Sequence, residues 1–113
     1  MLKGNEIEYI EAELKKFEFN RATIGYEAIR NGLMIAIQEP TLLYNLKRKF
    51  YNRIAKNMNL DSKRIKWNID RAINQMYLNT NTKIIMTYFS LNENEKITPK
   101  LFFMTIIDKF IIK

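Results

Sequence analysis

The chain has 113 residues, of which 47% are hydrophobic, and a formal net charge of +7, which together indicate one folded domain over residues 1–113 and exclude a disordered protein. It contains no cysteine and no histidine, so disulfides, thiolate chemistry and histidine-based catalysis are excluded, and a zinc site would need carboxylates alone. We therefore expect a protein that is not an enzyme and that binds neither a metal nor a cofactor.

Apolar residues recur at helical spacing in the first 40 residues. The first predicted helix spans about residues 6–17, and its apolar positions are Ile7, Ile10, Leu14 and Phe17. The second spans about residues 23–37, and its apolar positions are Ile29, Leu33, Ala36 and Ile37. Pro40 ends this helix, because the residue before a proline avoids the helical conformation.

The middle of the chain predicts two helices joined by a short turn. We expect the third helix to run unbroken over about residues 41–58 and the fourth over about residues 62–77. Asn59, Leu60 and Asp61 form the turn, because asparagine tolerates the left-handed backbone of tight turns and aspartate caps helix N-termini. So short a connection makes the helices cross sharply, as in a helix-turn-helix.

Two further helices complete the predicted fold. The fifth spans about residues 82–89, and the last begins at Thr98 and Pro99, a threonine cap followed by proline at the first helical position. The last helix is rich in apolar residues and is expected to pack across the core. The sequence therefore predicts an all-α, compact single-domain bundle of about six helices containing a helix-turn-helix.

The excess positive charge lies in one stretch of the chain. Residues 47–71 contain nine basic and two acidic residues, a net charge of +7, whereas the remainder has ten of each sign. A polyanion is the simplest partner for such a patch, and a solvated lysine surface is the alternative.

The exposed side of the fourth predicted helix has the residue types that contact bases. Arginine pairs bidentately with guanine, and asparagine or glutamine pairs with adenine. The predicted base-reading residues are Arg64, Lys66, Trp67, Asn68 and Arg71. The predicted phosphate-binding residues are Lys47, Arg48, Arg53, Lys56, Ser62 and Lys63. Two interpretations of Trp67 stay open: contact with sugars and thymine methyl groups, or half-buried structural support.

The segment Tyr51-Asn-Arg-Ile-Ala-Lys-Asn-Met-Asn-Leu-Asp-Ser-Lys-Arg64-Ile, followed by Ile69 and Ala72-Ile73, carries a family resemblance. It is similar to a Tyr-Pro-x-Ile-Ala-Lys motif followed by a Ser-Arg-Val-x-x-x-Ile-x-x-Ala-Ile helix. The chain thus resembles the C-terminal DNA-binding effector domain of stage-zero sporulation protein A, the master response regulator of endospore-forming bacteria. The resemblance implies six helices with a helix-turn-helix, duplex DNA binding and regulation of transcription, with domains often side by side on tandem sites.

The resemblance also carries implications for individual residues. The base-reading arginine of the family matches Arg64, whereas Lys66 and Trp67 stand where the family has glutamate and arginine. Asp70 and Arg71 stand where it has a basic residue and a histidine, so the target sequence is expected to differ. The full-length regulators carry a receiver domain upstream, and the start of this chain favours a standalone relative over an excised fragment.

The partners expected from the sequence follow from these features. We expect duplex DNA, with a homodimer or tandem arrangement on it, and contacts with a regulator or RNA polymerase. No apolar run approaches the roughly 20 residues of a membrane span and no signal peptide is present, so a cytoplasmic protein without membrane contact is expected. The alternative function is a receiver-less interaction module that modulates a full-length sporulation regulator through exposed Phe102, Phe103 and Phe110.

Overall fold

The computed structural model describes residues 3–92 and 94–112, and in these residues every regular element is helical. Six α-helices follow one another as α1 (Gly4–Leu14), α2 (Ile24–Gln38), α3 (Tyr51–Met58), α4 (Ser62–Asn79), α5 (Thr82–Phe89) and α6 (Pro99–Ile112). A 3-10 helix, η1 (Pro40–Tyr44), and a π-helix, η2 (Leu46–Phe50), connect α2 to α3. The predicted all-α, six-helix bundle is confirmed.

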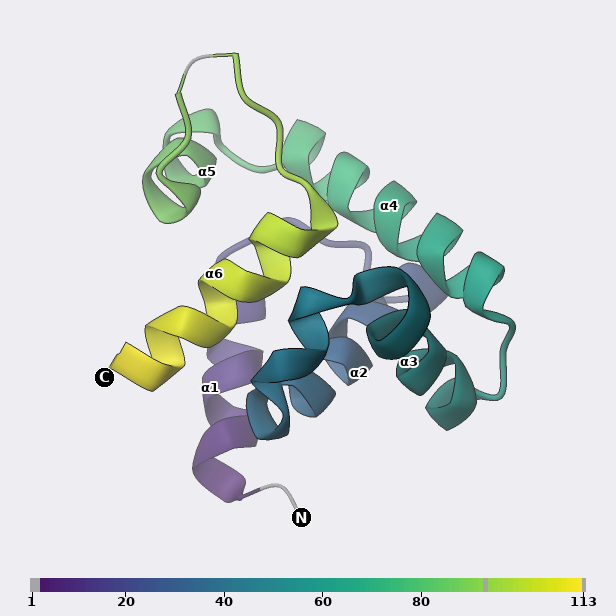
Figure 1. The fold of residues 1–113 in the computed structure, drawn as a ribbon. Helices are drawn as coiled ribbons and strands as arrows, with labels where there is room; N and C mark the ends of the chain where they lie inside the picture. Colours follow the sequence, from purple (N-terminus) through teal and green to yellow (C-terminus); the bar gives the residue numbers. More distant parts are fainter. Residues whose placement is uncertain (1–2, 93, 113) are drawn as a thin grey trace.

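Helix α2 lies at the centre of the bundle, where it contacts α1, α3, α4 and α6. Its Gly32 allows this packing, because a Cβ there would lie 2.9 Å from Cζ of Phe50 and 3.0 Å from Cε1 of Phe103. Figure 1 shows α4 along one edge of the molecule, whereas the C-terminal end of α6 lies on the opposite side. The helix with the predicted base-reading residues is therefore peripheral.

The last helix packs across the core as expected, but two of its aromatic residues were wrongly expected at the surface. Phe102 and Phe103 are each 0% exposed. Phe110 is half-buried, and its ring centroid lies 4.9 Å from that of Tyr9. These residues fill the space between α6 and its neighbours because α6 is apolar on most of its circumference. Phe102 and Phe103 therefore offer no contact surface for the interaction module considered above.

The expected third helix is not continuous, and this prediction was wrong. The chain leaves the helical conformation at Asn45, where φ is −140° and ψ is 77°. The Asn45 side chain accepts a 3.2 Å hydrogen bond from the Arg48 N–H, an alternative to a continuous backbone ladder. The adjacent Leu42 and Leu43 are both buried, which one helical stripe does not provide. The break therefore reorients the chain before α3.

The first helix also ends before its predicted boundary. Helix α1 stops at Leu14, yet Phe17 is only 4% exposed in the following loop. Its ring lies among the rings of Phe89 and Phe102, with centroids 5.5 and 6.0 Å away. The predicted burial of Phe17 is therefore confirmed, although its place in the helix is not.

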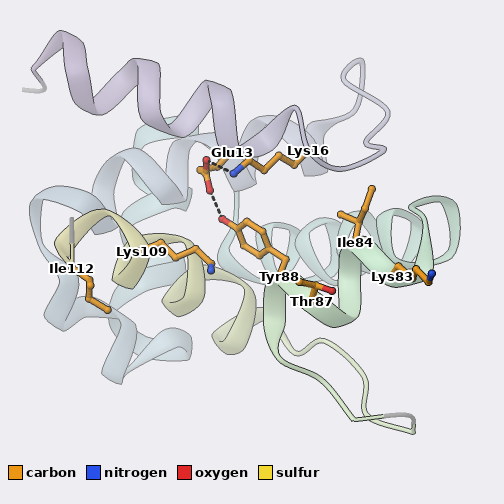
Figure 2. A pocket seen from close by; sticks show the side chains of 8 residues that line it. All are labelled: Glu13, Lys16, Lys83, Ile84, Thr87, Tyr88, Lys109 and Ile112. Atoms are coloured by element: carbon orange, nitrogen blue, oxygen red, sulfur yellow. Dashed lines mark hydrogen bonds and ion pairs between the residues drawn. The ribbon is translucent and has the colours of Figure 1, made fainter.

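A polar network that sequence reasoning missed joins α1 to α5 (Figure 2). The carboxylate of Glu13, a residue only 5% exposed, accepts a 2.6 Å hydrogen bond from the Tyr88 hydroxyl and lies 2.9 Å from Nζ of Lys16. Burial, together with the hydrogen bond to Glu13, raises the pKa of Tyr88 above its ordinary value. Nζ of Lys109 lies 4.7 Å from the centroid of the same ring. These contacts hold α5 against α1 and α6.

Candidate nucleic-acid interface

The turn between α3 and α4 has the geometry that the sequence predicts. Asn59 adopts the left-handed conformation, with φ 55° and ψ 46°, and the Leu60 N–H donates a 2.9 Å hydrogen bond to the Ala55 carbonyl. This pattern ends a helix tightly. The Asp61 carboxylate then accepts a 2.7 Å hydrogen bond from the Lys63 N–H and caps α4. The two helices are thereby joined through only three residues and pack against each other.

Helix α4 has one buried and one exposed side. The buried side consists of Ile65, Ile69, Ile73 and Met76, none more than 2% exposed. The exposed residues of the helix are Lys63, Arg64, Lys66, Trp67, Arg71, Asn74, Gln75, Leu78 and Asn79. The described part of the chain therefore leaves this side of α4 open to solvent.

Trp67 and Arg71 form the centre of the exposed side. Trp67 is 59% exposed, so more than half of its surface is open to solvent. The guanidinium carbon of Arg71 lies 5.2 Å from the centroid of the indole ring, within the range of a cation–π contact. Both side chains border two surface hollows of about 640 and 440 Å³. The pair therefore forms a ridge with a depression on each side.

Asn68 lies at the margin of this surface, next to α2. It is half-buried, and its amide nitrogen donates a 2.8 Å hydrogen bond to the carbonyl of Arg64 on the same helix. A Cβ on Gly25 would lie only 2.5 Å from the carbonyl oxygen of Asn68. The close approach of α2 therefore sets how far α4 projects from the bundle, and it restricts the conformation of Asn68.

Two of the predicted DNA-contacting cations are in ion pairs. Nζ of Lys66 lies 2.7 Å from Asp70, and Nη1 of Arg53 lies 2.9 Å from Glu39. All four side chains are more than 40% exposed, so these pairs are weak and can exchange for phosphate contacts. Burial, with a smaller contribution from the charge of Asp70, raises the pKa of Tyr51 beneath this surface.

The sequence of this domain matches a known protein family. Residues 10–110 match the model of the family described as "Sporulation initiation factor Spo0A C terminal". The chain belongs to this family. The resemblance found in the sequence is thereby confirmed, and membership of the Spo0A C-terminal family identifies a DNA-binding domain of transcription regulation in sporulation rather than a member of an enzyme family. No curated protein matches the chain.

The candidate phosphate contacts of this Spo0A C-terminal domain lie on η2, on α3 and in the first turn of α4. The exposed members are Lys47, Arg48, Arg53, Lys56 and Lys63, and Ser62 is half-buried. Lys47 and Arg48 lie on η2, after the break at Asn45, whereas Arg53 and Lys56 lie on the following helix, α3.

Two residues near this surface were missed by sequence reasoning. Tyr44 is 72% exposed at the end of η1, close in sequence to Lys47 and Arg48. Lys96 lies in the loop before α6 and borders the larger hollow beside the ridge. Lys96 lies 25 residues from the basic stretch, so only the fold brings it to this surface.

The described residues of the Spo0A C-terminal domain contain neither a metal-binding cluster nor a membrane-spanning helix. They contain no group of three or more aspartate or glutamate side chains placed to hold a metal ion. Within the same residues, no helix combines the length and apolar character needed to cross a lipid bilayer.

Proposed function

We propose that the chain is a sequence-specific DNA-binding regulator of transcription that places α4 in the major groove of duplex DNA. The observation that carries this proposal is the exposed side of α4, with Arg64, Trp67 and Arg71 at the surface and an apolar stripe opposite. The major groove is about 12 Å wide and accepts one helix. A net charge of +7 within residues 47–71 supplies the attraction to phosphate.

The proposal divides the surface into two sets of contacts. Residues on α4 contact base edges, and these are Arg64, Lys66, Trp67, Asn68 and Arg71. Residues around them contact phosphates and fix the register, and these are Lys47, Arg48, Arg53, Lys56, Ser62 and Lys63. Binding to chromosomal DNA places the protein in the cytoplasm of a bacterium.

The base contacts are tested by enriching duplexes from a random pool and titrating the enriched duplex with variants. Arg64→Ala and Arg71→Ala should each relax the preference at one base pair, by about 5- to 150-fold for a lost bidentate contact. Measuring affinity for every single-base substitution of the enriched duplex gives this preference directly. If both variants keep the full preference of the wild type, the assignment of base contacts to α4 is wrong.

The phosphate contacts are tested by the dependence of affinity on salt. Lys47→Ala and Lys56→Ala should weaken binding to all duplexes alike, and each should reduce the slope of log affinity against log salt by about 0.9. Lys83→Ala on α5 removes the same charge from an exposed position outside this surface and serves as the control. An equal change of slope in the control would point to net charge rather than local contacts.

The arrangement on DNA is a separate part of the proposal. Family regulators bind tandem sites, so we expect two copies of this chain side by side on a duplex with two enriched sites. Sedimentation of the complex measures the stoichiometry, and one copy per two-site duplex at saturation would contradict tandem binding.

A further inference from the structure

Trp67 exposes a large apolar ring on the cationic surface of α4. It is the only tryptophan of the chain, and 59% of it is exposed. Its ring contacts the guanidinium of Arg71 and leaves apolar area uncovered at the surface. Such a ring gains most from a partner that presents an apolar group at the same place.

The major groove presents one apolar group that depends on sequence, the C5 methyl of thymine. We infer that Trp67 selects thymine through this methyl group, and that Arg71, held on the indole ring, selects a guanine nearby. The inference rests on the proposed function, because it needs α4 in the major groove. It goes beyond that proposal by naming the bases that this pair recognises.

The contact with the Trp67 ring suits Arg71 to this role. The guanidinium is planar, and its carbon lies over the ring at 5.2 Å from the centroid, a contact that does not use up its N–H groups as donors to an acceptor pair. Guanine O6 and N7 accept two such bonds side by side. The ring therefore restricts a long side chain to orientations from which it donates bidentately.

The spacing of the pair sets the distance between the two bases. Trp67 and Arg71 are four residues apart in α4, which corresponds to about 6 Å along the helix axis. Base pairs follow one another at about 3.4 Å. For a helix that follows the groove, the thymine and the guanine should lie within about two base pairs of each other.

The first experiment removes the thymine methyl alone. The full chain is bound to its enriched duplex, in which each thymine is replaced, one at a time, by deoxyuridine. At one or two positions the wild type should lose about fourfold in affinity, the worth of burying one methyl-sized group. Trp67→Ala should show no loss at these positions, and Trp67→Phe, which keeps an apolar ring, should retain part of it.

The second experiment tests the role of the ring in holding Arg71. Replacing the guanine by 7-deazaguanine removes the N7 acceptor, and the wild type should lose about tenfold for one hydrogen bond to a charged donor. Arg71→Ala should be insensitive to this replacement, and Trp67→Ala should lose less than the wild type. Ile111→Ala on α6 is the matched control, because Ile111 has the same 59% exposure. Far-ultraviolet circular dichroism checks that each variant is folded.

The outcomes separate this inference from the proposed function. If no duplex is enriched, the proposed function fails. If a duplex is enriched but the deoxyuridine penalty is absent, or is equal in the wild type and Trp67→Ala, the inference fails and the proposed function stands. Equal weakening of all duplexes by Trp67→Ala, without a change in thymine preference, would assign the ring to sugar contacts and also overturn the inference.

Discussion

The close approach of Gly25 to α4 offers a direct test of how the fold positions the exposed helix. Gly25 lies in the first turn of α2, and a Cβ there would lie 2.5 Å from the carbonyl oxygen of Asn68 and 2.8 Å from Cβ of Ala72. Real Cβ atoms rarely approach other atoms closer than 3.0 Å. Gly25→Ala should therefore force α4 away from α2 by several tenths of an ångström or more.

The expected cost follows from two opposing effects. Forcing an extra carbon into a packed contact costs about 1–3 kcal/mol, and the Asn68 oxygen cannot yield alone because it belongs to the backbone of α4. Alanine favours a helix over glycine by up to about 1 kcal/mol. We expect a net loss of about 1–2 kcal/mol in the free energy of unfolding, which lowers Tm by roughly 4–10 °C.

The assay compares Gly25→Ala with Gly4→Ala in urea and thermal unfolding followed by circular dichroism. Gly4 begins α1, and a Cβ there meets no atom within 4 Å, so Gly4→Ala should leave stability unchanged or slightly raised. On DNA, Gly25→Ala should weaken binding to an enriched duplex more than to an unrelated one, because base contacts depend more strictly on position than phosphate contacts.

One result would refute this reasoning. If Gly25→Ala is as stable as the wild type and keeps both its affinity and its sequence preference, then the contact between α2 and α4 does not set the position of the exposed helix. The position of α4 relative to the bundle would then depend on the α3–α4 turn and the core residues alone.

Three further predictions concern single contacts. Asp70→Asn releases Lys66 from its 2.7 Å ion pair and removes a negative charge from the α4 surface, so affinity for duplex DNA should rise about threefold in an anisotropy titration, and unchanged affinity would contradict this. Asn59→Val should cost about 1–2 kcal/mol in urea unfolding because φ is 55°, whereas Asn59→Gly should be neutral or stabilising, and equal stability of the two would count against the turn geometry. Tyr88→Phe removes one hydrogen bond to the buried Glu13, which keeps its ion pair with Lys16, and should cost about 1–2 kcal/mol at pH 7. Burial raises the pKa of Tyr88 in the folded protein, so above about pH 10 its hydroxyl loses its proton in the unfolded chain before it does so in the folded one. The free energy of unfolding of the wild type should therefore fall above this pH, and it should fall less in Tyr88→Phe, which has no hydroxyl.

The features that the sequence predicted correctly depend on local chemistry. Asn59 and Asp61 act on backbone groups within four residues, so the turn and the start of α4 could be placed from the residue types alone. Helix α5 spans Thr82–Phe89, as predicted from its short apolar run.

The features that the sequence did not predict depend on contacts between distant segments. Glu13 is buried because Tyr88, 75 residues later in the chain, donates to it, and no pattern near Glu13 signals this partner. The break at Asn45 accompanies the burial of two consecutive leucines, which is decided by the surrounding helices. Phe102 and Phe103 are both fully buried, and an amphipathic pattern could not show that neither of them reaches solvent.

Packing in the bundle and the proposed base contacts involve different residues of α4. The four residues that hold it in the bundle are Ile65, Ile69, Ile73 and Met76, and none of them is among the proposed base contacts. If the proposed base contacts hold, a substitution at Lys66, Trp67 or Arg71 should alter the preferred operator while the domain remains folded. The same bundle could then serve different regulatory targets through changes at single exposed side chains.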